Sequence, residues 1–577
     1  STSYVNRVAG LYVTNPGGLG VLSVDAGGDI TLQAAQIHNA GLNGLAQLAG
    51  VGNVNVTTLR TGRSTDTTWN ARNYGRSAST AEVGTTISGA GDVQLIAGQD
   101  INARAAQINA GDSVQLAAGR DISITEGRAT TDISNATYKK SSGFLSKRSH
   151  SEQVTQSTDT GIGSNISAGG GVDIAAGRDY LQRGSNVLGN DNVSIAAGNN
   201  VTIESSQDTF HQDIQVASKK SGFSGGIKDG VASVGYGSAG SKSRSTIDAT
   251  TQVASGVGSL SGNVTIKAGD QLTLAGSDVA AGNNLTLIGK DVKLEARQDT
   301  YEEHTTRSSK QSGFSVGATV NPLAAYKAGR DSANAQGGNY SDSTIGKLAQ
   351  RGEGTSEGAH AATQGVVVQA GSSRSNGQSD YASSTARTTQ LSAGNNLTIL
   401  ATEGSITSQG TQMSAEGDAL LLAKQHIDLD VAHNTESQSD TSTRSGWQVA
   451  TNPRMAVGVH KQNADGNGVT DTITGTQISA GGDVTLATQE GDITLTAAQV
   501  VAENDVNIAA ARNLTIQSGQ DTASNANRRD DKAIGSVVIS DTERFVGYHA
   551  EKDNSRNASV TQVASNVGSL SGNVNLT

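Results

Sequence analysis

GNVTIKAGDQLTLAGSDVAAGNNLTL, the sequence of residues 262–287, contains four short alternations of apolar and polar residues separated by small turns. The alternations begin at Val264, Leu272, Val279 and Leu285. Because successive side chains of a strand point to opposite faces, the apolar residues of each alternation share one face. We therefore predict short strands that bury Val, Ile and Leu and expose Thr, Ser, Gln and Lys.

The predicted strands recur at a constant interval along the chain. Equivalent apolar residues are 21 or 22 positions apart in four pairs: Val93 and Val114, Val172 and Val193, Val264 and Leu285, and Val484 and Val506. Three strands in about 21 residues form one triangular turn of a solenoid, whose coils stack about 4.8 Å apart. The sequence thus predicts an all-β fold, a parallel β-helix with about 21 residues per coil.

Gly, Asn and Asp occupy the predicted corners, where the backbone needs positive φ or a side chain that bonds its own backbone. Three turns are expected at equivalent corners, where stacked Asn side chains could pair as a ladder: Gly198-Asn199-Asn200, Gly282-Asn283-Asn284 and Gly394-Asn395-Asn396. Five Asp residues also lie at corners: Asp29, Asp92, Asp112, Asp121 and Asp483. The nine-residue motif of calcium-binding rolls is absent, so we expect local turn hydrogen bonds and no metal site.

The composition fits a polar repeat protein with a thin core. Of 577 residues, 34% are hydrophobic and 3% aromatic, with 72 Gly and no Cys, which excludes a disulfide framework. The formal net charge of -11 shows no excess of basic residues of the kind that binds nucleic acid. No stretch of about eighteen apolar residues and no leader is present, and the chain stops within a repeat. We therefore expect a fragment of a longer protein.

A second, longer period overlies the coils. Polar segments lead to Ser142-Gly143-Phe144, Ser221-Gly222-Phe223, Ser312-Gly313-Phe314 and Ser445-Gly446-Trp447. Each aromatic residue is followed by an excursion too long for a simple loop, for example 224–262, 315–391 and 448–476. Alternation within the excursions predicts hairpins that project from the β-helix, and these could pair from copy to copy into a larger sheet associated with a membrane. The match between 251–255 and 561–565 shows that the return to the coils is itself repeated.

Basic residues lie close to most of these aromatic residues. An aromatic rim beside cations suits a membrane interface or a partner surface, whereas the alternative is an aromatic residue folded back onto the β-helix. The candidate contact residues are Lys139, Lys140, Phe144, Lys219, Lys220, Phe223, Phe314 and Trp447. The two periods divide the chain into coil and excursion units at 1–87, 88–262, 263–390, 391–477 and 478–577.

The coil motif, the Ser-Gly-Phe excursions and residues 9–13 and 29–37 together resemble the filamentous haemagglutinin repeat family over essentially the whole chain. Within that family the chain is most similar to the effectors of contact-dependent growth inhibition, which are exported by two-partner secretion. The resemblance implies a right-handed β-helical filament, secreted through a partner transporter to the surface of a Gram-negative bacterium, with a toxin module in cis beyond this fragment. The excursions resemble the second of two repeat regions, which is implicated in moving the toxin across the target outer membrane.

Because some β-helices are polysaccharide lyases or hydrolases, the coil faces were searched for converging carboxylates. The centres of the apolar triplets are almost all Thr, Ser or Gln, with Asp173 and Asp428 as isolated exceptions. The nine His residues show no paired ligand spacing and are expected to be exposed polar residues: His38, His150, His211, His304, His360, His426, His433, His460 and His549. We predict neither an enzyme nor a cofactor site.

Two functions remain open from the sequence. The first is a non-catalytic filament segment that presents a C-terminal toxin and delivers it across the target outer membrane, with the membrane or its proteins as partners and no nucleic acid. The second is a filamentous adhesin that binds host-cell or biofilm glycans. The excursions are the expected site of contact in either case.

Overall fold

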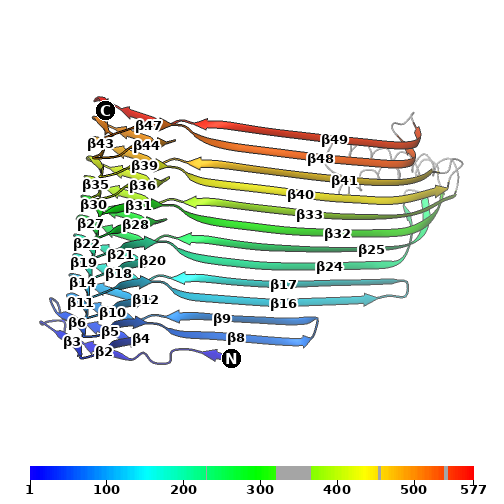
Figure 1. Cartoon of the computed structure of the whole chain (residues 1–577). Helices are drawn as coiled ribbons and strands as arrows, with labels where there is room; N and C mark the ends of the chain where they lie inside the picture. Colours follow the sequence, from blue (N-terminus) through cyan, green and yellow to red (C-terminus); the bar gives the residue numbers. More distant parts are fainter. Residues whose placement is uncertain (229–230, 320–365, 452–455, 539–543) are drawn as a thin grey trace.

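The computed structural model describes residues 1–228, 231–319, 366–451, 456–538 and 544–577. These residues contain β-strands and no α-helix, so no helix among them could cross a membrane. Three parallel sheets wrap into a column, and a fourth, antiparallel sheet extends from one side of it (Figure 1). The predicted parallel β-helix with projecting hairpins is confirmed.

Each coil places one strand in each of three parallel sheets. The first coil sheet consists of β2 (Gly10–Val13), β5 (Gln36–Asn39), β10 (Thr86–Gly89), β13 (Gln107–Ala110), β18 (Asn165–Ala168), β21 (Asn186–Gly189), β26 (Gly256–Ser259), β29 (Asp278–Ala281), β34 (Gln390–Ala393), β37 (Gln412–Ala415), β42 (Gln477–Ala480), β45 (Gln499–Ala502) and β50 (Asn566–Ser569). The second consists of β3 (Val21–Ala26), β6 (Leu45–Gly50), β11 (Asp92–Ala97), β14 (Val114–Ala118), β19 (Val172–Ala176), β22 (Val193–Ala197), β27 (Val264–Ala268), β30 (Leu285–Gly289), β35 (Leu397–Ala401), β38 (Ala419–Ala423), β43 (Val484–Thr488), β46 (Val506–Ala509) and β51 (Val574–Leu576). The third consists of β4 (Ile30–Gln33), β7 (Val54–Thr57), β12 (Ile101–Arg104), β15 (Ile122–Thr125), β20 (Tyr180–Arg183), β23 (Val201–Glu204), β28 (Gln271–Ala275), β31 (Asp291–Glu295), β36 (Ile406–Gln409), β39 (Ile427–Asp430), β44 (Ile493–Thr496) and β47 (Leu514–Gln517).

The predicted apolar pairs meet in register on neighbouring coils. Val93 pairs with Val114, and Val264 pairs with Leu285, each 21 positions later. The apolar residues of these strands are buried, whereas the Thr or Gln between them is only partly covered. The core is therefore a set of parallel apolar stacks, in which every coil covers the inner face of the next.

The antiparallel sheet is built from six hairpins, one for every second coil, and is called the hairpin sheet below. Its strands are β1 (Thr2–Ser3), β8 (Leu59–Asn70), β9 (Asn73–Val83), β16 (Gly127–Ser142), β17 (Ser146–Ile162), β24 (Ser206–Lys228), β25 (Val231–Val253), β32 (Arg297–Thr319), β33 (Val366–Arg387), β40 (Ala432–Thr451), β41 (Ala456–Thr474), β48 (Gly519–Val538) and β49 (Arg544–Val563). Every hairpin leaves from the corner between the third and first coil sheets. The predicted pairing of excursions into a larger sheet is thus confirmed.

The coils without a hairpin close the same corner with one residue at positive φ. These residues are Ala34, Ala105, Gly184, Gly276, Gly410 and Ala497, with φ between 45° and 63°. A left-handed residue reverses the chain in the smallest space, which is why three of the six are Gly. The corner therefore has two interchangeable forms, a single left-handed residue or a whole hairpin.

Side-chain oxygens at the other two corners bond from coil to coil. Between the first and second coil sheets, Asn263 Oδ1 accepts the Asn284 N–H at 3.1 Å, and Asn284 Oδ1 accepts the Asn396 N–H at 3.2 Å. Asp418 and Asp483 continue this ladder with acceptor distances of 2.8 and 2.9 Å. The predicted pairing of Asn side chains is present between Asn263 and Asn284, whereas from Asn284 to Asp483 the side-chain oxygens accept main-chain N–H groups.

Two expectations about the corners were wrong. The corner Asp residues were expected to bond within their own turn, but Asp121 Oδ1 accepts the Asp179 N–H of the next coil at 3.2 Å. The stacking of coils leaves these amides with no partner in their own turn, so the acceptor comes from the neighbouring coil. The three Gly-Asn-Asn turns are also not equivalent. The turn at 198–200 precedes the third coil sheet, whereas those at 282–284 and 394–396 precede the second, because both corners need the same Asx acceptor.

The hairpin corner is sealed by a ladder of buried hydroxyl groups that the sequence analysis missed. The members that are at most 1% exposed are Thr85, Ser164, Ser185, Ser255, Ser277, Thr389, Thr411 and Thr476. Ser164 shows the bonding: its Oγ donates to the Thr125 carbonyl at 2.8 Å and accepts the Ala106 N–H at 2.9 Å. Ser255, Thr389 and Thr476 likewise donate to backbone carbonyls that would otherwise stay unsatisfied, whereas the Thr411 hydroxyl is buried without a partner.

We expect Ser164→Ala to lower the free energy of unfolding by about 1–3 kcal/mol, because the Ala106 N–H stays buried without an acceptor. The urea midpoint of the full chain measures the loss. Ser194→Ala, at a partly exposed position on β22, is the matched control and should change stability by less than about 0.5 kcal/mol. Equal midpoints for the two variants would contradict a sealing role for Ser164.

Candidate functional site

The hairpin sheet is exposed on both faces and reaches well away from the column (Figure 1). The outgoing strands of the hairpins include the polar segments that precede the aromatic residues, because β24 begins at Ser206 and β32 begins at Arg297. The excursions predicted to start after the aromatic residues therefore begin earlier, and the aromatic residues lie far out along the hairpins. Residues 320–365 of the excursion predicted at 315–391 lie outside the described residues.

Aromatic rings of three successive strands stack near the free end of the sheet. Phe223 on β24 faces Tyr236 on β25, which in turn faces Phe314 on β32. The ring centroids are 5.0 Å apart in the first pair and 6.4 Å in the second. These side chains remain 52%, 40% and 50% exposed, so the stack forms part of the surface.

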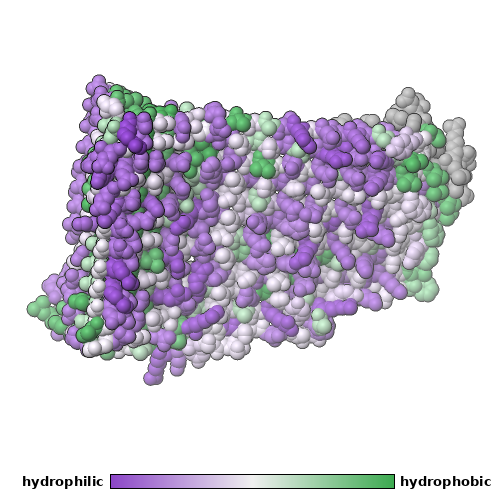
Figure 2. Space-filling view, viewed as in Figure 1, coloured by the Kyte–Doolittle hydropathy of each residue, from purple (hydrophilic) through white to green (hydrophobic). Residues whose placement is uncertain are grey.

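Apolar side chains extend this stack across the sheet on the same face. Trp447 faces Val459, Val459 faces Ile534, and Ile534 faces Tyr548. Valines at alternate positions of the same strands, which point to the same side, complete what we call the apolar band: Phe223, Val234, Tyr236, Phe314, Val316, Val368, Trp447, Val457, Val459, Ile534, Val546 and Tyr548. Figure 2 shows hydrophobic residues gathered at this free end.

A row of glycines crosses the sheet on the opposite face. The residues paired in register from β24 to β49 are Gly222, Gly237, Gly313, Gly371, Gln448, Gly458, Gly535 and Gly547. Alternation places each Gly of the Ser-Gly-Phe motif behind the aromatic row. Apart from Gln448, this row therefore carries no side chain behind the apolar band.

Basic side chains form a row across the same face as the apolar band, four residues nearer the column on β24, β25 and β32 and two residues nearer on β40 to β49. The register from β16 to β49 is Lys140, Ser149, Lys219, Gly240, Lys310, Arg374, Ser445, Lys461, Lys532 and Ala550, which we call the basic row. Its six cations are all exposed, and no acidic residue occurs in it. Within the described chain, the ion pair recorded for this row joins Lys532 to Asp530 at 3.8 Å.

The structure separates the predicted contact residues into two faces. Lys140 and Lys219 belong to the basic row, whereas Lys139 and Lys220 point to the opposite face. Phe223, Phe314 and Trp447 lie in the apolar band. Phe144 lies in the turn between β16 and β17, outside the stack, and is 98% exposed.

Several surface residues were not found from the sequence. A signal existed for Lys310, because Lys-x-Ser-Gly-Phe occurs at 140–144, 219–223 and 310–314. Lys532 occupies the same place in Lys532-Ala533-Ile534-Gly535. Tyr236, Arg374 and Lys461 lie on return strands without a motif, and only the strand register places them in the rows.

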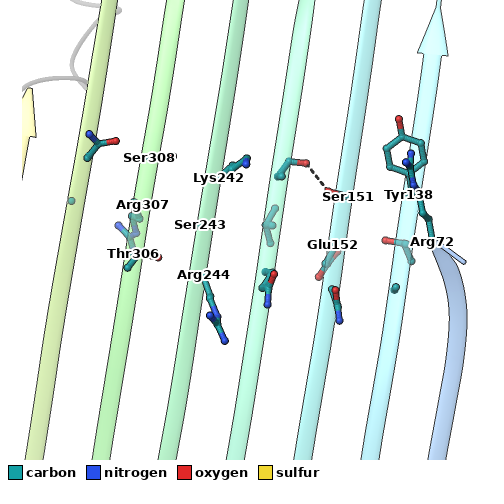
Figure 3. A pocket seen from close by; sticks show the side chains of 18 of the residues that line it. Arg72, Tyr138, Ser151, Glu152, Lys242, Ser243, Arg244, Thr306, Arg307 and Ser308 are labelled. Carbon is teal, nitrogen blue, oxygen red and sulfur yellow. Dashed lines mark hydrogen bonds between the residues drawn. The ribbon is translucent and has the colours of Figure 1, made fainter. Parts of the chain in front are cut away.

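A shallow groove of about 740 Å³ runs across the strands between the basic row and the column. Figure 3 shows side chains of neighbouring strands lining it, among them Tyr138, Lys242 and Arg244. Gln153, Gln215 and Gln378 add amide groups. Tyr138 carries Arg72 over its ring at 4.9 Å, and Arg244 donates two hydrogen bonds to Asp213, which lower the pKa of that carboxyl.

Ion pairs at the roots of the hairpins link the hairpin sheet to the column. Arg104 on β12 donates two hydrogen bonds to Glu82 on β9, at 2.7 and 3.0 Å. These bonds hold the pKa of Glu82 below its usual range. Arg297 at the start of β32 contacts Glu204 at 3.0 Å in the same way.

We expect Glu82→Gln to lower stability at pH 7 by about 1–3 kcal/mol, because Arg104 loses its charged partner. The folded pKa of Glu82 is lowered, so its contribution is present above about pH 4.3 and is lost as the pH falls through the folded pKa. Urea midpoints of the two proteins should differ at pH 7 and converge at lower pH. Glu152→Gln, at an exposed position, is the control, and a difference that persists at pH 2 would refute the assignment.

The outer faces of the coils bring no carboxylates together at the positions that raised an enzyme hypothesis. Asp173 lies between Gln115 and Ser194, and Asp428 lies between Thr407 and Thr494. The described part of the chain contains no group of three His, Cys, Asp or Glu residues that could hold a metal ion. His211 and His433 are exposed and bond Asp248 and Asp471 at 2.6 and 3.0 Å, while His360 lies outside the described residues.

A protein-family model described as a hemagglutinin repeat matches residues 70–146, 145–240, 234–372, 368–533 and 457–577. Toxin CdiA of Yersinia pestis is 30% identical over 401 residues, covering 66% of this chain and 12% of the relative. tRNA nuclease CdiA-2 of Burkholderia pseudomallei is 30% identical over 74% of this chain and 14% of its own length. Deoxyribonuclease CdiA of Yersinia pseudotuberculosis is 31% identical over 64% of this chain and 36% of its own length. This chain thus spans about a third or less of each relative, and no solved structure matches it.

Proposed function

The chain belongs to the hemagglutinin repeat family, and from this membership we propose that it is a non-catalytic filament segment of a contact-dependent growth inhibition effector. The relatives are named for different activities, a tRNA nuclease and a deoxyribonuclease among them, yet they share this region. A region common to proteins with different activities does not supply the difference between them. The toxin module therefore lies in cis, outside the 577 residues.

The β-helix acts as the rigid shaft in this proposal. Its coils are joined by main-chain hydrogen bonds, apolar stacks and two Asx ladders, all of which run along the filament axis. The filament is secreted by a two-partner secretion transporter to the surface of a Gram-negative bacterium. The names of the relatives, toxins and nucleases, favour toxin delivery over the adhesin alternative.

The hairpin sheet contacts the outer membrane of the target cell in this proposal. The observation that carries it is the exposed apolar band beside the basic row on one face of the free end. Of the residues singled out from the sequence, Lys140, Lys219, Phe223, Phe314 and Trp447 make this contact. Lys139 and Lys220 lie on the other face and Phe144 lies in a turn, outside this contact.

The two interchangeable corner forms allow a test that removes the hairpins and keeps the shaft. Deleting residues 205–253 joins Glu204 to Ala254-Ser255-Gly256, which copies the hairpin-free corner Arg183-Gly184-Ser185-Asn186. The equivalent deletions, each of which leaves Gly or Ala at the left-handed position, are 58–83, 126–162, 297–388, 431–474 and 518–563. We expect the effector that lacks all six hairpins to reach the cell surface and to lose inhibition of target cells.

Surface antibody labelling and a competition assay against target cells measure display and delivery separately. Deletion of 58–83 alone is the matched control, because β8 and β9 are short and carry neither the apolar band nor the basic row. That control should retain most of the inhibition. Full inhibition by the hairpin-free effector would show that the hairpin sheet has no part in delivery.

A further inference from the structure

The basic row places like charges directly opposite one another on neighbouring strands. Lys310 faces Arg374, and Lys461 faces Lys532, on neighbouring antiparallel strands. Like charges directly opposite one another destabilise a sheet. The row itself contains no acidic residue, its cations are exposed, and Asp530 offsets Lys532 from a neighbouring position on β48. This line of cations therefore has the charge pattern of a surface that meets an external layer of anions.

The apolar band lies on the same face, between the basic row and the free end of the sheet. The two rows are four residues apart on β24, β25 and β32 and two residues apart from β40 to β49, which corresponds to about 13 Å and about 7 Å along a strand. Lys and Arg side chains are long enough to bridge much of this distance while their stems cover apolar surface. Aromatic and aliphatic groups near the free end, with cations nearer the column, match the order of acyl chains and head groups in a membrane interface.

The groove adds a third layer on the opposite side of the basic row. Its lining includes amide groups of Gln153, Gln215 and Gln378, and the Tyr74 and Tyr138 rings each carry an arginine over one face. Amide and guanidinium groups offer the hydrogen bonds that the hydroxyl groups of sugars require. From the free end inward, this face thus presents apolar, cationic and polar layers in a fixed order.

We propose that this face of the hairpin sheet binds a membrane surface made of phosphorylated glycolipid. The apolar band contacts the acyl layer, the basic row contacts the phosphate groups, and the groove contacts the sugars above them. The inference rests on the proposed function for the identity of the membrane and adds the chemistry of the lipid. A nucleic acid or a soluble polyanion matches the cations but leaves the apolar band uncovered.

Sedimentation of the purified 577-residue chain with vesicles tests this proposal without any delivery step. The three vesicle types contain phosphatidylcholine alone, phosphatidylcholine with phosphatidylglycerol, or phosphatidylcholine with lipopolysaccharide at matched phosphate content. We expect the strongest binding to lipopolysaccharide, weaker binding to phosphatidylglycerol and little binding to phosphatidylcholine. Equal binding to the two anionic vesicle types, or preference for soluble heparin over both, overturns the glycolipid assignment.

Charge variants show which face binds. The variant K219Q/K310Q/R374Q removes three cations from the basic row and should weaken binding to both anionic vesicle types by roughly a hundredfold. The variant K139Q/R148Q/K220Q removes three exposed cations from the opposite face and should change binding by less than about threefold. Equal losses in the two variants overturn the proposal, because non-specific attraction would then account for binding.

Variants of the other two layers separate their contributions. F223S/Y236S/F314S should weaken binding to both anionic vesicle types while keeping the preference for lipopolysaccharide. Q153A/Q215A/Q378A should remove that preference and leave binding to phosphatidylglycerol unchanged. All substituted side chains are exposed or partly exposed, and circular dichroism checks that each variant is folded. If the Gln variant still prefers lipopolysaccharide over phosphatidylglycerol, the groove is not part of the binding site.

Vesicle binding and delivery can fail independently. If the chain binds the vesicles as expected but the hairpin-free effector still inhibits target cells, the proposed function fails and the lipid site stands. If that effector loses inhibition while the intact chain ignores lipopolysaccharide, the proposed function stands and the lipid site fails.

Discussion

The spacing of β-strands within a sheet is the constraint on which the rest of this structure depends. Each coil of the column rises by one strand spacing, about 4.8 Å, and each hairpin is two strands wide. Two coils and one hairpin therefore have the same height, about 9.6 Å. Because a hairpin leaves the column at every second coil, successive hairpins arrive next to each other at hydrogen-bonding distance. One hairpin per coil would crowd the sheet, and one per three coils would leave gaps between hairpins.

This match explains how a polar hairpin of some twenty residues per strand can be ordered without a core of its own. An isolated two-stranded hairpin is marginal in water, whereas here each of the four inner hairpins has neighbours on both sides along most of its length. The column supplies the position and direction of each root through Arg104 with Glu82, Arg297 with Glu204, and the buried hydroxyl ladder. The column thus provides the buried core, and strand pairing with neighbouring hairpins stabilises each hairpin from its root outward.

The coils could be predicted from the sequence because one face of each coil strand is buried. Burial forces Val264 and Ile266 to be apolar and lets Thr265 be polar, so period two is visible. The hairpin strands face water on both sides, so the polar lead-in at 206–220 shows no alternation of apolar and polar residues. The sequence therefore predicts no strand there. The buried hydroxyls were missed because a Ser or Thr at a corner looks like an ordinary turn residue until its partners, such as the Ala106 amide, are known.

The candidate surface was predictable only in part, for a related reason. The outgoing strands carry Lys-x-Ser-Gly-Phe, whose repetition marked Phe223 and Phe314, but a motif on one strand says nothing about the strand that returns beside it. Tyr236 joins the stack because the hairpin pairs it with Phe223, and Arg374 joins the basic row because the hairpin pairs it with Lys310. Each row is therefore a property of strand register and of repetition together. Every hairpin starts at the same corner of a coil, so residues at the same distance from the root lie side by side on neighbouring strands. A motif that is repeated every two coils therefore forms a continuous row of similar side chains. A surface of this kind grows longer with each added repeat, which suits a partner that is itself extended and repetitive.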